Sequence, residues 1–535
     1  MSRRDKLLQI IKELVKMPSI TESAAESMPA QWIYKRLGKL EYFTENPQNI
    51  KYIPTPLEGA EEELHAVVAI VNSLNKTNRT VLMLGHFDVV DISCYGEMAK
   101  YAFDADKLTK NLSSRNDILY GRGVMDMKCG VALMLDIVEE FASNREMFDV
   151  NIVAAFVGDE ENSSAGMRGV VPLLSQMHES GTDFLCALNT EPGEAGQTGI
   201  SGPMIFLGTL GKLMPSFYIK GRGAHVGNYY QGFSSALIAA KIVSIAEGAP
   251  ELADPQHGNC EPSWICLDIN AMRKTYNVTV PDCSYVYFNC FTTSNTPAVI
   301  LEQMKNVALR AIEDGNEQLK VSCDAVKEHG FNGSAFNPAA PKVFLLSDLV
   351  NRARKNCENF DDEIQKFIEV LPKGDMRARG ISIVNKISEL SCEDGPYVVC
   401  FFLPPWLPVR TDSTDNVRDK AVVKVAREIE NELKEKYAMK MTEVELFAGL
   451  CDLSYVGGRI SDVDARSYEE NLPGWGIVYG MPLDAMKELG MPVMNIGPSG
   501  EGAHKKDEYL NLRYSLDILP RILRSTIRRL SDTIV

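Results

Sequence analysis

The chain has 535 residues, a length that suggests two to four domains. Asp and Glu number 72 against 56 Lys and Arg, and the resulting net charge of −16 argues against a nucleic acid or an anionic membrane surface as the main partner. The 12 cysteines are scattered without a CxxC pair, which offers no zinc–thiolate site and is typical of free thiols in a reducing compartment.

The N-terminal segment is predicted to be an amphipathic helix over residues 5–17, followed by a second helix over about 24–37. Glu13 and Lys16 interrupt the first apolar run, and no small-residue cleavage site follows, so the segment does not resemble a signal peptide. No stretch approaches the roughly 18 apolar residues that a membrane span needs. We therefore expect a cytoplasmic protein without a membrane partner.

Short apolar runs typical of buried strands alternate with predicted helices, which indicates an α/β sheet. Polar side chains follow the ends of four such runs. The runs are 81–85, 151–157, 184–188 and 492–496, and the side chains after them are His86, Asp88, Glu160, Glu161, Glu191 and His504. A helix over 127–143 follows a glycine-containing turn that holds Asp126. Because ligands of open α/β sheets bind at the carboxyl ends of strands, we expect these side chains to converge.

The middle of the chain changes character between about residues 211 and 335. The elements expected there alternate between strand and helix: 213–220, 233–246, 284–292 and 298–312. We interpret them as a compact α+β unit inserted between the halves of a larger domain.

Residues 336–440 are harder to assign. The elements expected there are helices near 343–371 and 416–437 and an apolar strand at 397–403. We place them in the larger domain, which then comprises residues 1–210 and 336–535, while residues 211–335 form the inserted domain.

Three of the seven histidines, His86, His225 and His504, belong to glycine-containing turns after predicted strands. His86 and Asp88 are two residues apart, so on an extended segment they point to the same side, and Asp88 can orient the imidazole. Imidazole and carboxylate ligands without thiolates suit zinc, and also cobalt or manganese. Two histidines and three carboxylates are enough for two metals if one carboxylate bridges them.

Adjacent acids raise a separate question at Glu160 and Glu161. In a turn, neighbouring side chains can fan out around one site, so that one carboxylate binds a metal while the other stays free as a general base. For this pair taken alone, a solvated acidic turn is the alternative. For Asp126 taken alone, the alternative is an ordinary helix start after a loop.

Six motifs occur in the order found in one known family. They are Gly85–Val90 (GHFDVV), Gly121–Gly130 (GRGVMDMKCG), Asp159–Glu161 (DEE), Glu191-Pro192 (EP), Gly223–Gly227 (GAHVG) and Gly502–Tyr509 (GAHKKDEY). Together they resemble the dinuclear-zinc family of aminoacylases, glutamate carboxypeptidases, dipeptidases and succinyl-diaminopimelate desuccinylases. The resemblance covers residues 5 to about 300 and about 440 to the end. The extra length and the Pro404-Pro405 segment are most similar to the arginine-utilisation (RocB-type) branch.

The resemblance implies a metal ligand at each of five positions. His86 and Glu191 would bind one metal, Glu161 and His504 would bind the other, and Asp126 would bridge them. The implied cofactors are two divalent metal ions, with zinc expected and cobalt or manganese as alternatives.

The resemblance also implies catalytic roles. Glu160 would be the general base that takes a proton from the attacking water and passes it to the leaving amine, with Asp88 as the orienting acid. His225, in the inserted domain, would stabilise the oxyanion, often reaching the site from a second subunit. Asn277 matches the family's lid asparagine and would contact the substrate.

The implied fold is an α/β, zinc-peptidase-like catalytic domain with a central mixed sheet flanked by helices, plus an inserted α+β lid/dimerisation domain that would make the protein a homodimer. The implied reaction is metal-dependent hydrolysis of an amide bond in a small peptide or N-acyl amino acid, within amino-acid (arginine) catabolism for the branch named above. One departure concerns the substrate carboxylate, because the family often carries an arginine after the lid asparagine, where this chain reads Tyr287–Thr292. The alternatives are a non-catalytic metal- or ligand-binding protein that kept the fold and, less well supported, a nucleotide-binding α/β protein, for which the sequence has no phosphate loop.

Overall fold

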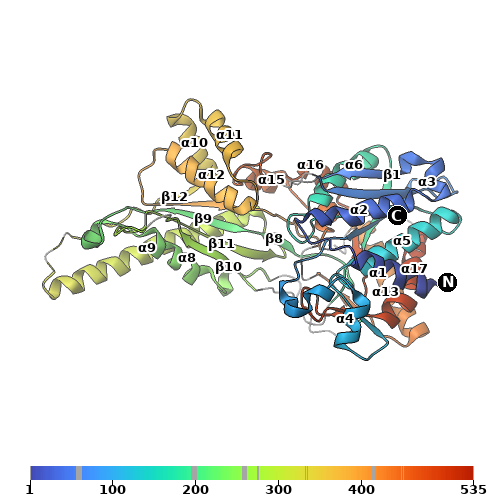
Figure 1. The fold of residues 1–535 in the computed structure, drawn as a ribbon. Helices are drawn as coiled ribbons and strands as arrows, with labels where there is room; N and C mark the ends of the chain where they lie inside the picture. Colours follow the sequence, from blue (N-terminus) through green and yellow to red (C-terminus); the bar gives the residue numbers. More distant parts are fainter. Residues whose placement is uncertain are drawn as a thin grey trace. The chain divides into compact units, whose positions relative to one another are not determined.

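The computed structural model describes residues 2–55, 63–193, 202–255, 262–273, 276–331, 333, 335–411, 416–447, 449 and 451–533. The chain divides into two compact units, which Figure 1 shows coloured along the sequence. Unit 1 comprises Met1–Leu210, Leu407–Arg459 and Pro482–Val535, and unit 2 comprises Gly211–Trp406 and Ile460–Met481.

An eight-stranded mixed sheet is the centre of unit 1. Its strands, in spatial order, are β1 (Ile50–Pro54), β2 (His65–Val71), β5 (Asn151–Val157), β3 (Arg79–His86), β6 (Asp183–Asn189), β15 (Val493–Asn495), β7 (Met204–Phe206) and β14 (Thr442–Val444). Strands β5, β3, β6 and β15 are mutually parallel. Their carboxyl ends therefore lie along one edge of the sheet, where open α/β sheets bind their ligands.

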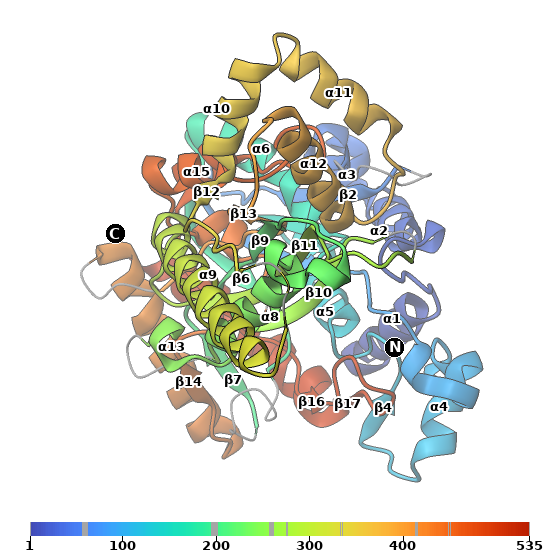
Figure 2. The same cartoon turned by 90° about the vertical axis from the view of Figure 1, so that its left-hand side faces the viewer.

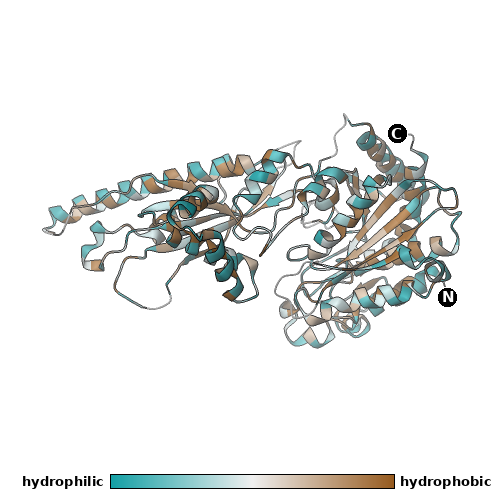
Figure 3. Cartoon of the chain, turned by 90° about the horizontal axis from the view of Figure 1, so that it is seen from above, coloured by the Kyte–Doolittle hydropathy of each residue, from teal (hydrophilic) through white to brown (hydrophobic). Residues whose placement is uncertain are grey.

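Helices flank this sheet, and its strands are hydrophobic in Figure 3. The helices of unit 1 are α1 (Arg3–Val15), α2 (Met28–Leu37), α3 (Glu41–Glu45), α4 (Ala105–Leu112), α5 (Lys128–Ser143), α6 (Ala165–Glu179), α13 (Val417–Tyr437), α14 (Ser454–Gly457), α16 (Leu483–Leu489) and α17 (Leu519–Asp532). The main core packs α1, α5, α13 and α17 against apolar side chains of the sheet. Helix α5 is buried from Lys128 to Val138, as expected for a helix that is apolar all round.

A buried ion-pair cluster ties three of these helices together. Asp136 of α5 lies 2.9 Å from Lys6 Nζ of α1 and 2.7 Å from Arg524 Nη2 of α17. Burial opposes the charge on Asp136, but these two cations outweigh burial and lower the pKa of its carboxyl.

A small second sheet lies in the same unit and brings two distant segments together. Strand β17 (Tyr509–Asn511) pairs antiparallel with both β16 (Gly500–Glu501) and β4 (Ile118–Tyr120). The segment that carries His504 is thereby fixed beside the turn that follows β4 and carries Asp126.

Unit 2 is built on another sheet, in the order β10 (Ile265–Ala271), β11 (Cys283–Thr292), β9 (Pro215–Lys220), β13 (Tyr397–Phe402) and β12 (Val343–Leu345), with β8 (Gly211–Leu213) on β11. Its helices are α8 (Ser235–Ala246), α9 (Pro297–Glu328), α10 (Leu346–Asn356), α11 (Phe360–Val370), α12 (Met376–Leu390) and α15 (Asp462–Glu469). Helices α8 and α9 lie side by side against the sheet (Figure 2). Strand β11 alternates between buried and half-buried residues because one of its faces meets helix α8.

The predicted fold class, a central mixed sheet flanked by helices plus an inserted α+β unit, is confirmed. The boundaries differ from the prediction, which placed residues 336–440 in the larger domain. Residues 336–406 instead group with unit 2, because β12 and β13 extend its sheet through β9. Residues 460–481 join the same unit, where α15 packs on α9.

Individual elements were predicted with different success. Strand β5 and helix α5 match their expected ranges to within one residue. Helix α9 is much longer than the expected 298–312, and the sequence prediction contained no helix corresponding to α12. None of the helices in the described part of the chain combines the length and apolar character needed to cross a lipid bilayer.

Candidate metal centre

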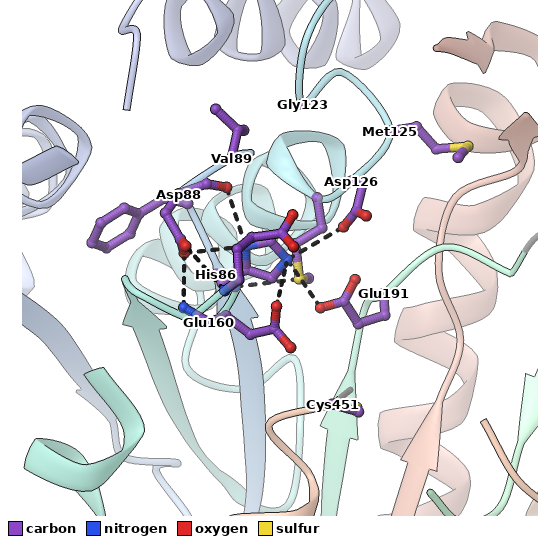
Figure 4. Close-up of polar contacts among 12 residues, drawn as sticks. His86, Asp88, Val89, Gly123, Met125, Asp126, Glu160, Glu191 and Cys451 are labelled. Carbon is purple, nitrogen blue, oxygen red and sulfur yellow. Dashed lines mark hydrogen bonds and ion pairs between the residues drawn. The ribbon is translucent and has the colours of Figure 1, made fainter. Parts of the chain in front are cut away.

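His86 is the last residue of β3 and the centre of a group of carboxylates (Figure 4). Its Nε2 atom lies 3.1 Å from Glu191 Oε1, 3.3 Å from Asp126 Oδ1 and 3.9 Å from Glu160 Oε2. The imidazole is only 1% exposed. These side chains follow the carboxyl ends of β5 and β6 or precede α5, so the convergence expected from the strand ends is observed.

Asp126 faces two histidines with its two oxygens. Oδ1 lies 3.3 Å from His86 Nε2, and Oδ2 lies 3.2 Å from His504 Nε2. The turn that holds Asp126 lies close to the end of β6, because a Cβ added to Gly130 would come within 2.6 Å of the Thr190 carbonyl oxygen. Glycine at position 130 therefore permits the first turn of α5 to approach the segment that carries Glu191.

Asp88 connects His86 with the turn that follows β5. Its Oδ1 lies 3.3 Å from His86 Nδ1 and accepts a hydrogen bond from the Glu160 backbone N–H at 3.2 Å. Its Oδ2 accepts from the Glu161 backbone N–H, also at 3.2 Å. The sequence suggested only the contact with His86. The two backbone bonds mean that one carboxylate orients both the imidazole and the pair of glutamates.

Glu160 and Glu161 point to different places from this turn. Glu160 is 6% exposed and faces His86, whereas Glu161 Oε1 lies 3.0 Å from His504 Nε2. The preceding residue, Asp159, fixes the turn with φ of 63° and accepts a hydrogen bond from the Ala165 N–H at the start of α6. Neighbouring side chains therefore fan out around the site.

The charges of the cluster are strongly coupled. Burial opposes protonation of His86, but Glu191, Asp126 and Asp88 outweigh burial and raise the pKa of His86 well above its usual value. Asp126 and Glu161 raise the pKa of His504 to about 11.

The pKa values of the buried glutamates are raised, which is the direction that burial alone favours. Burial raises the pKa of Glu191 to about 8, although His86 acts in the opposite direction. Burial likewise raises the pKa of Glu160 well above that of a free glutamate.

The donor set suits divalent cations. His86, Asp126 and Glu161 each offer a ligand atom within 4.8 Å of the others, and so do His86, Glu160 and Glu191. The carboxylates outnumber the imidazoles, so cations can replace the shared protons of the cluster and neutralise its excess negative charge. Nitrogen and oxygen donors of this kind bind zinc, cobalt or manganese.

Several neighbours of the centre were not predicted. Asp452 is 1% exposed, and its charge interacts with those of His86, Asp88 and Glu160. Cys451, drawn in Figure 4, accepts a hydrogen bond from Asn189 Nδ2 at 3.1 Å. Their segment follows no long predicted strand, so no sequence signal pointed to them. Glu508 could have been found, because it lies four residues after His504 within a motif already singled out.

The two remaining predicted site residues, His225 and Asn277, belong to unit 2. His225 is exposed and pairs through its backbone with Thr279, two residues after Asn277. His225 Nδ1 accepts a hydrogen bond from the Gly227 N–H at 3.1 Å, and Asn277 Oδ1 accepts one from the Thr279 N–H at 3.3 Å. The two predicted residues therefore lie in neighbouring segments of this unit.

Comparison with known proteins identifies the family. The model of peptidase family M20/M25/M40 matches residues 82–529. The Bacillus subtilis (strain 168) protein YqjN is 29% identical over 98% of this chain and 96% of its own length, and protein RocB of the same organism is 24% identical over 98% and 95%. A succinyl-diaminopimelate desuccinylase of Leptothrix cholodnii is 28% identical over 42% of this chain and 56% of its own.

Solved structures show the same fold. The M20 family metallo-carboxypeptidase Sso-CP2 from Sulfolobus solfataricus has a TM-score of 0.54 at 13% identity, covering 98% of this chain and 99% of its own. The dipeptidase Dug1p from Saccharomyces cerevisiae also has a TM-score of 0.54 at 13% identity, covering 100% and 98%. The chain therefore belongs to peptidase family M20/M25/M40 and is an enzyme of the metallopeptidase and amidohydrolase class.

Proposed function

We propose that this enzyme hydrolyses an amide bond in a small peptide or an N-acyl amino acid, using two divalent ions held by five side chains. His86 and Glu191 would hold one ion, Glu161 and His504 would hold the other, and Asp126 would bridge the two. One observation carries this assignment: the two oxygens of Asp126 face two different imidazoles, at 3.3 and 3.2 Å. A carboxylate whose only role was to cap α5 would not need to lie between two histidines.

Bound divalent ions would supply a Lewis acid that polarises the scissile carbonyl and makes water acidic enough to attack near neutral pH. Glu160 is the general base of the proposal. It is 6% exposed, and burial raises its pKa, which brings proton uptake and release closer to the working pH. Asp88 keeps Glu160 in place through the backbone N–H and orients His86, so its role is to position these groups.

Zinc is the expected metal, since the donors are imidazoles and carboxylates. Cobalt and manganese accept the same donors and are the alternatives.

Unit 2 would act as the lid and dimerisation domain. His225 Nδ1 accepts from the Gly227 N–H, so the neutral imidazole carries its proton on Nε2, which is then a donor for a substrate oxyanion. Asn277 lies beside it as a further substrate contact.

The exposed side chains of β10 support a homodimer through this unit. Strand β10 is an edge strand of the sheet formed by the described residues of unit 2, and it exposes Ile265, Leu267 and Ile269 by 37%, 52% and 44%. An exposed apolar edge strand of this kind can pair with the same strand of a second copy around a two-fold axis.

A role in amino-acid catabolism, with arginine as the amino acid, rests on the similarity to RocB along 98% of the chain. The family's usual arginine for a substrate carboxylate is replaced by the sequence Tyr287–Thr292. We therefore expect that substrates with a free carboxylate are not preferred over amidated ones.

The test is a screen of the metal-free protein, reloaded with zinc, cobalt or manganese, against dipeptides and N-acyl amino acids. At least one substrate should be hydrolysed, and Glu160→Gln should lower the rate by about 10²- to 10⁴-fold while metal content stays unchanged. Glu179→Gln, at the exposed end of α6, is the matched control and should keep the wild-type rate. Bound metal without turnover on any substrate would favour the non-catalytic binding protein instead.

A further inference from the structure

Glu508 is fully buried and binds the turn that carries Asp126. Its Oε2 accepts hydrogen bonds from Arg122 Nη1 at 2.9 Å and from the Gly123 N–H at 3.0 Å. Its Oε1 accepts from the N–H groups of Met125 at 3.0 Å and Asp126 at 3.3 Å. A single carboxylate thus binds three backbone donors and one guanidinium of the same turn.

Arg122 extends this contact to His504. The guanidinium is 1% exposed, and besides Glu508 its Nη2 donates to the carbonyl oxygens of His504 at 3.3 Å and Asp91 at 3.2 Å. His504 has φ of 63°, a conformation that costs energy for a residue with a Cβ and therefore needs support from its surroundings. The carbonyl bond from Arg122 is one such support.

Position 123 of this turn favours glycine. Gly123 has φ of 73°, and a Cβ at this position would come within 2.4 Å of Val89 Cγ1. The Glu508 carboxylate therefore lies against a backbone conformation that favours glycine, and the four donors all point at it.

We propose that Arg122 and Glu508 are a positioning pair that sets the spacing between Asp126 and His504, and thereby the affinity of the centre for its ions. The pair joins segments 386 residues apart in the sequence. It holds the Asp126 turn through Glu508 and the His504 backbone through Arg122, on either side of the 3.2 Å contact between Asp126 Oδ2 and His504 Nε2. This inference rests on the metal centre proposed above.

The two members of the pair should have distinguishable effects. Glu508→Gln places an amide NH₂ opposite one set of N–H donors, which disturbs the turn of Asp126, so the affinity for both ions should fall. Arg122→Lys keeps the charge, but an ammonium lacks the planar fork that reaches Glu508 and His504 at once. It should therefore weaken mainly the ion on the His504 side.

The experiment measures metal dissociation constants by chelator competition, together with the visible spectrum of the cobalt-loaded protein. Each variant should bind metal about 10- to 100-fold more weakly, the usual loss when an outer partner of a metal ligand is removed. The double variant should lose little more than the worse single variant, because the two residues act as one unit. The cobalt spectrum should change as well, which a general loss of stability would not cause in folded protein.

Arg410→Lys is the matched control. Arg410 pairs with Asp419 in the same unit, and the two side chains are as buried as the proposed pair, at 1% and 0% exposed. This variant should lose thermal stability but keep its metal affinity. Equal metal loss in Arg410→Lys and Arg122→Lys would overturn the proposal, and so would wild-type affinity and spectrum in Glu508→Gln.

Hydrogen exchange on the wild-type protein tests the pair without depending on whether the variants fold. The backbone amides of Gly123, Met125 and Asp126 should exchange hydrogen slowly even without metal, because Glu508 binds all three. Exchange as fast as that of exposed amides would refute the pair without any substitution. Wild-type protein that binds no divalent ion would refute the proposed function and, with it, the effect of the pair on metal affinity. Slow exchange of these three amides would then still show that Glu508 holds the Asp126 turn.

Discussion

Asp88→Asn offers a sharp test of how the centre is held together. The carboxylate accepts from the backbone N–H groups of Glu160 and Glu161, both at 3.2 Å, and lies 3.3 Å from His86 Nδ1. An asparagine of the same size can accept at only one of its two terminal atoms. Whichever way its amide is placed, its NH₂ faces one of the backbone N–H groups, and that buried donor loses its partner.

The cost follows from this geometry. A buried donor without a partner costs about 1–3 kcal/mol. Since about 1.4 kcal/mol corresponds to a factor of ten, a cost that falls entirely on the metal-bound arrangement weakens metal binding by roughly 5- to 150-fold. The range agrees with the loss of about 10- to 100-fold that is typical when a carboxylate beside a metal-bound histidine is removed.

The assay is chelator competition on the purified variant, with turnover measured at saturating metal. Thr21→Val is the control, because it removes the 3.0 Å hydrogen bond from Thr21 Oγ1 to Asp88 Oδ2 and leaves both backbone bonds in place. It should change metal affinity by less than a factor of about ten, the effect of one ordinary hydrogen bond. Asp88→Asn with wild-type affinity and rate would refute the view that Asp88 organises the centre.

Elemental analysis should find two metal ions per chain in the wild-type protein. Asp126→Ala should lose the second ion, because the Asp126 carboxylate faces both imidazoles. One ion in both the wild type and the variant would contradict the dinuclear assignment. Glu161→Gln should lose metal as well as rate, whereas Glu160→Gln should lose rate alone, and equal metal loss in the two would show that base and ligand were exchanged. His225→Ala should lower turnover by about 10²-fold or more with metals retained, as for the loss of an oxyanion donor. If His225 acts across a dimer, mixing this variant with Glu160→Gln should restore part of the activity. No recovery after proven subunit exchange would rule out a role of His225 in the partner's site. The pKa of the Asp136 carboxyl is lower in the folded protein than in the unfolded chain, where an aspartate has a pKa of about 4. Its ion pairs therefore stabilise the fold fully above that unfolded pKa, and this stability is lost as the pH falls through the lower pKa of the folded state. Asp136→Asn leaves buried cations without their partner and should therefore be roughly 3–5 kcal/mol less stable at pH 7. This difference in the free energy of unfolding should shrink in thermal melts taken at progressively lower pH, and a difference independent of pH would argue against the ion pairs as its cause.

Much of the site could be predicted from the sequence because its chemistry lies next to strand ends. A strand such as β3 is readable from its apolar run, and the residue that ends it, His86, must then lie at the carboxyl edge of the sheet. The same reasoning placed Glu191 after β6. Helix α9 shows the limit of this reasoning, since its second half carries polar and charged residues whose periodicity is weak, and the helix continues to Glu328.

The sequence by itself determined which donor groups exist and beside which strand each one lies, because strand, turn and first helical turn are set by residues that are neighbours in the chain. Only the tertiary structure decided which distant segments meet. Strand β13 joins the sheet of unit 2 through β9, although its uniformly apolar residues would suit either sheet, since apolar character specifies burial and not a partner. From the sequence, Glu508 is an ordinary acid after a histidine motif. It becomes the acceptor for the Asp126 turn only because β17 pairs with β4, a strand far from it in the chain.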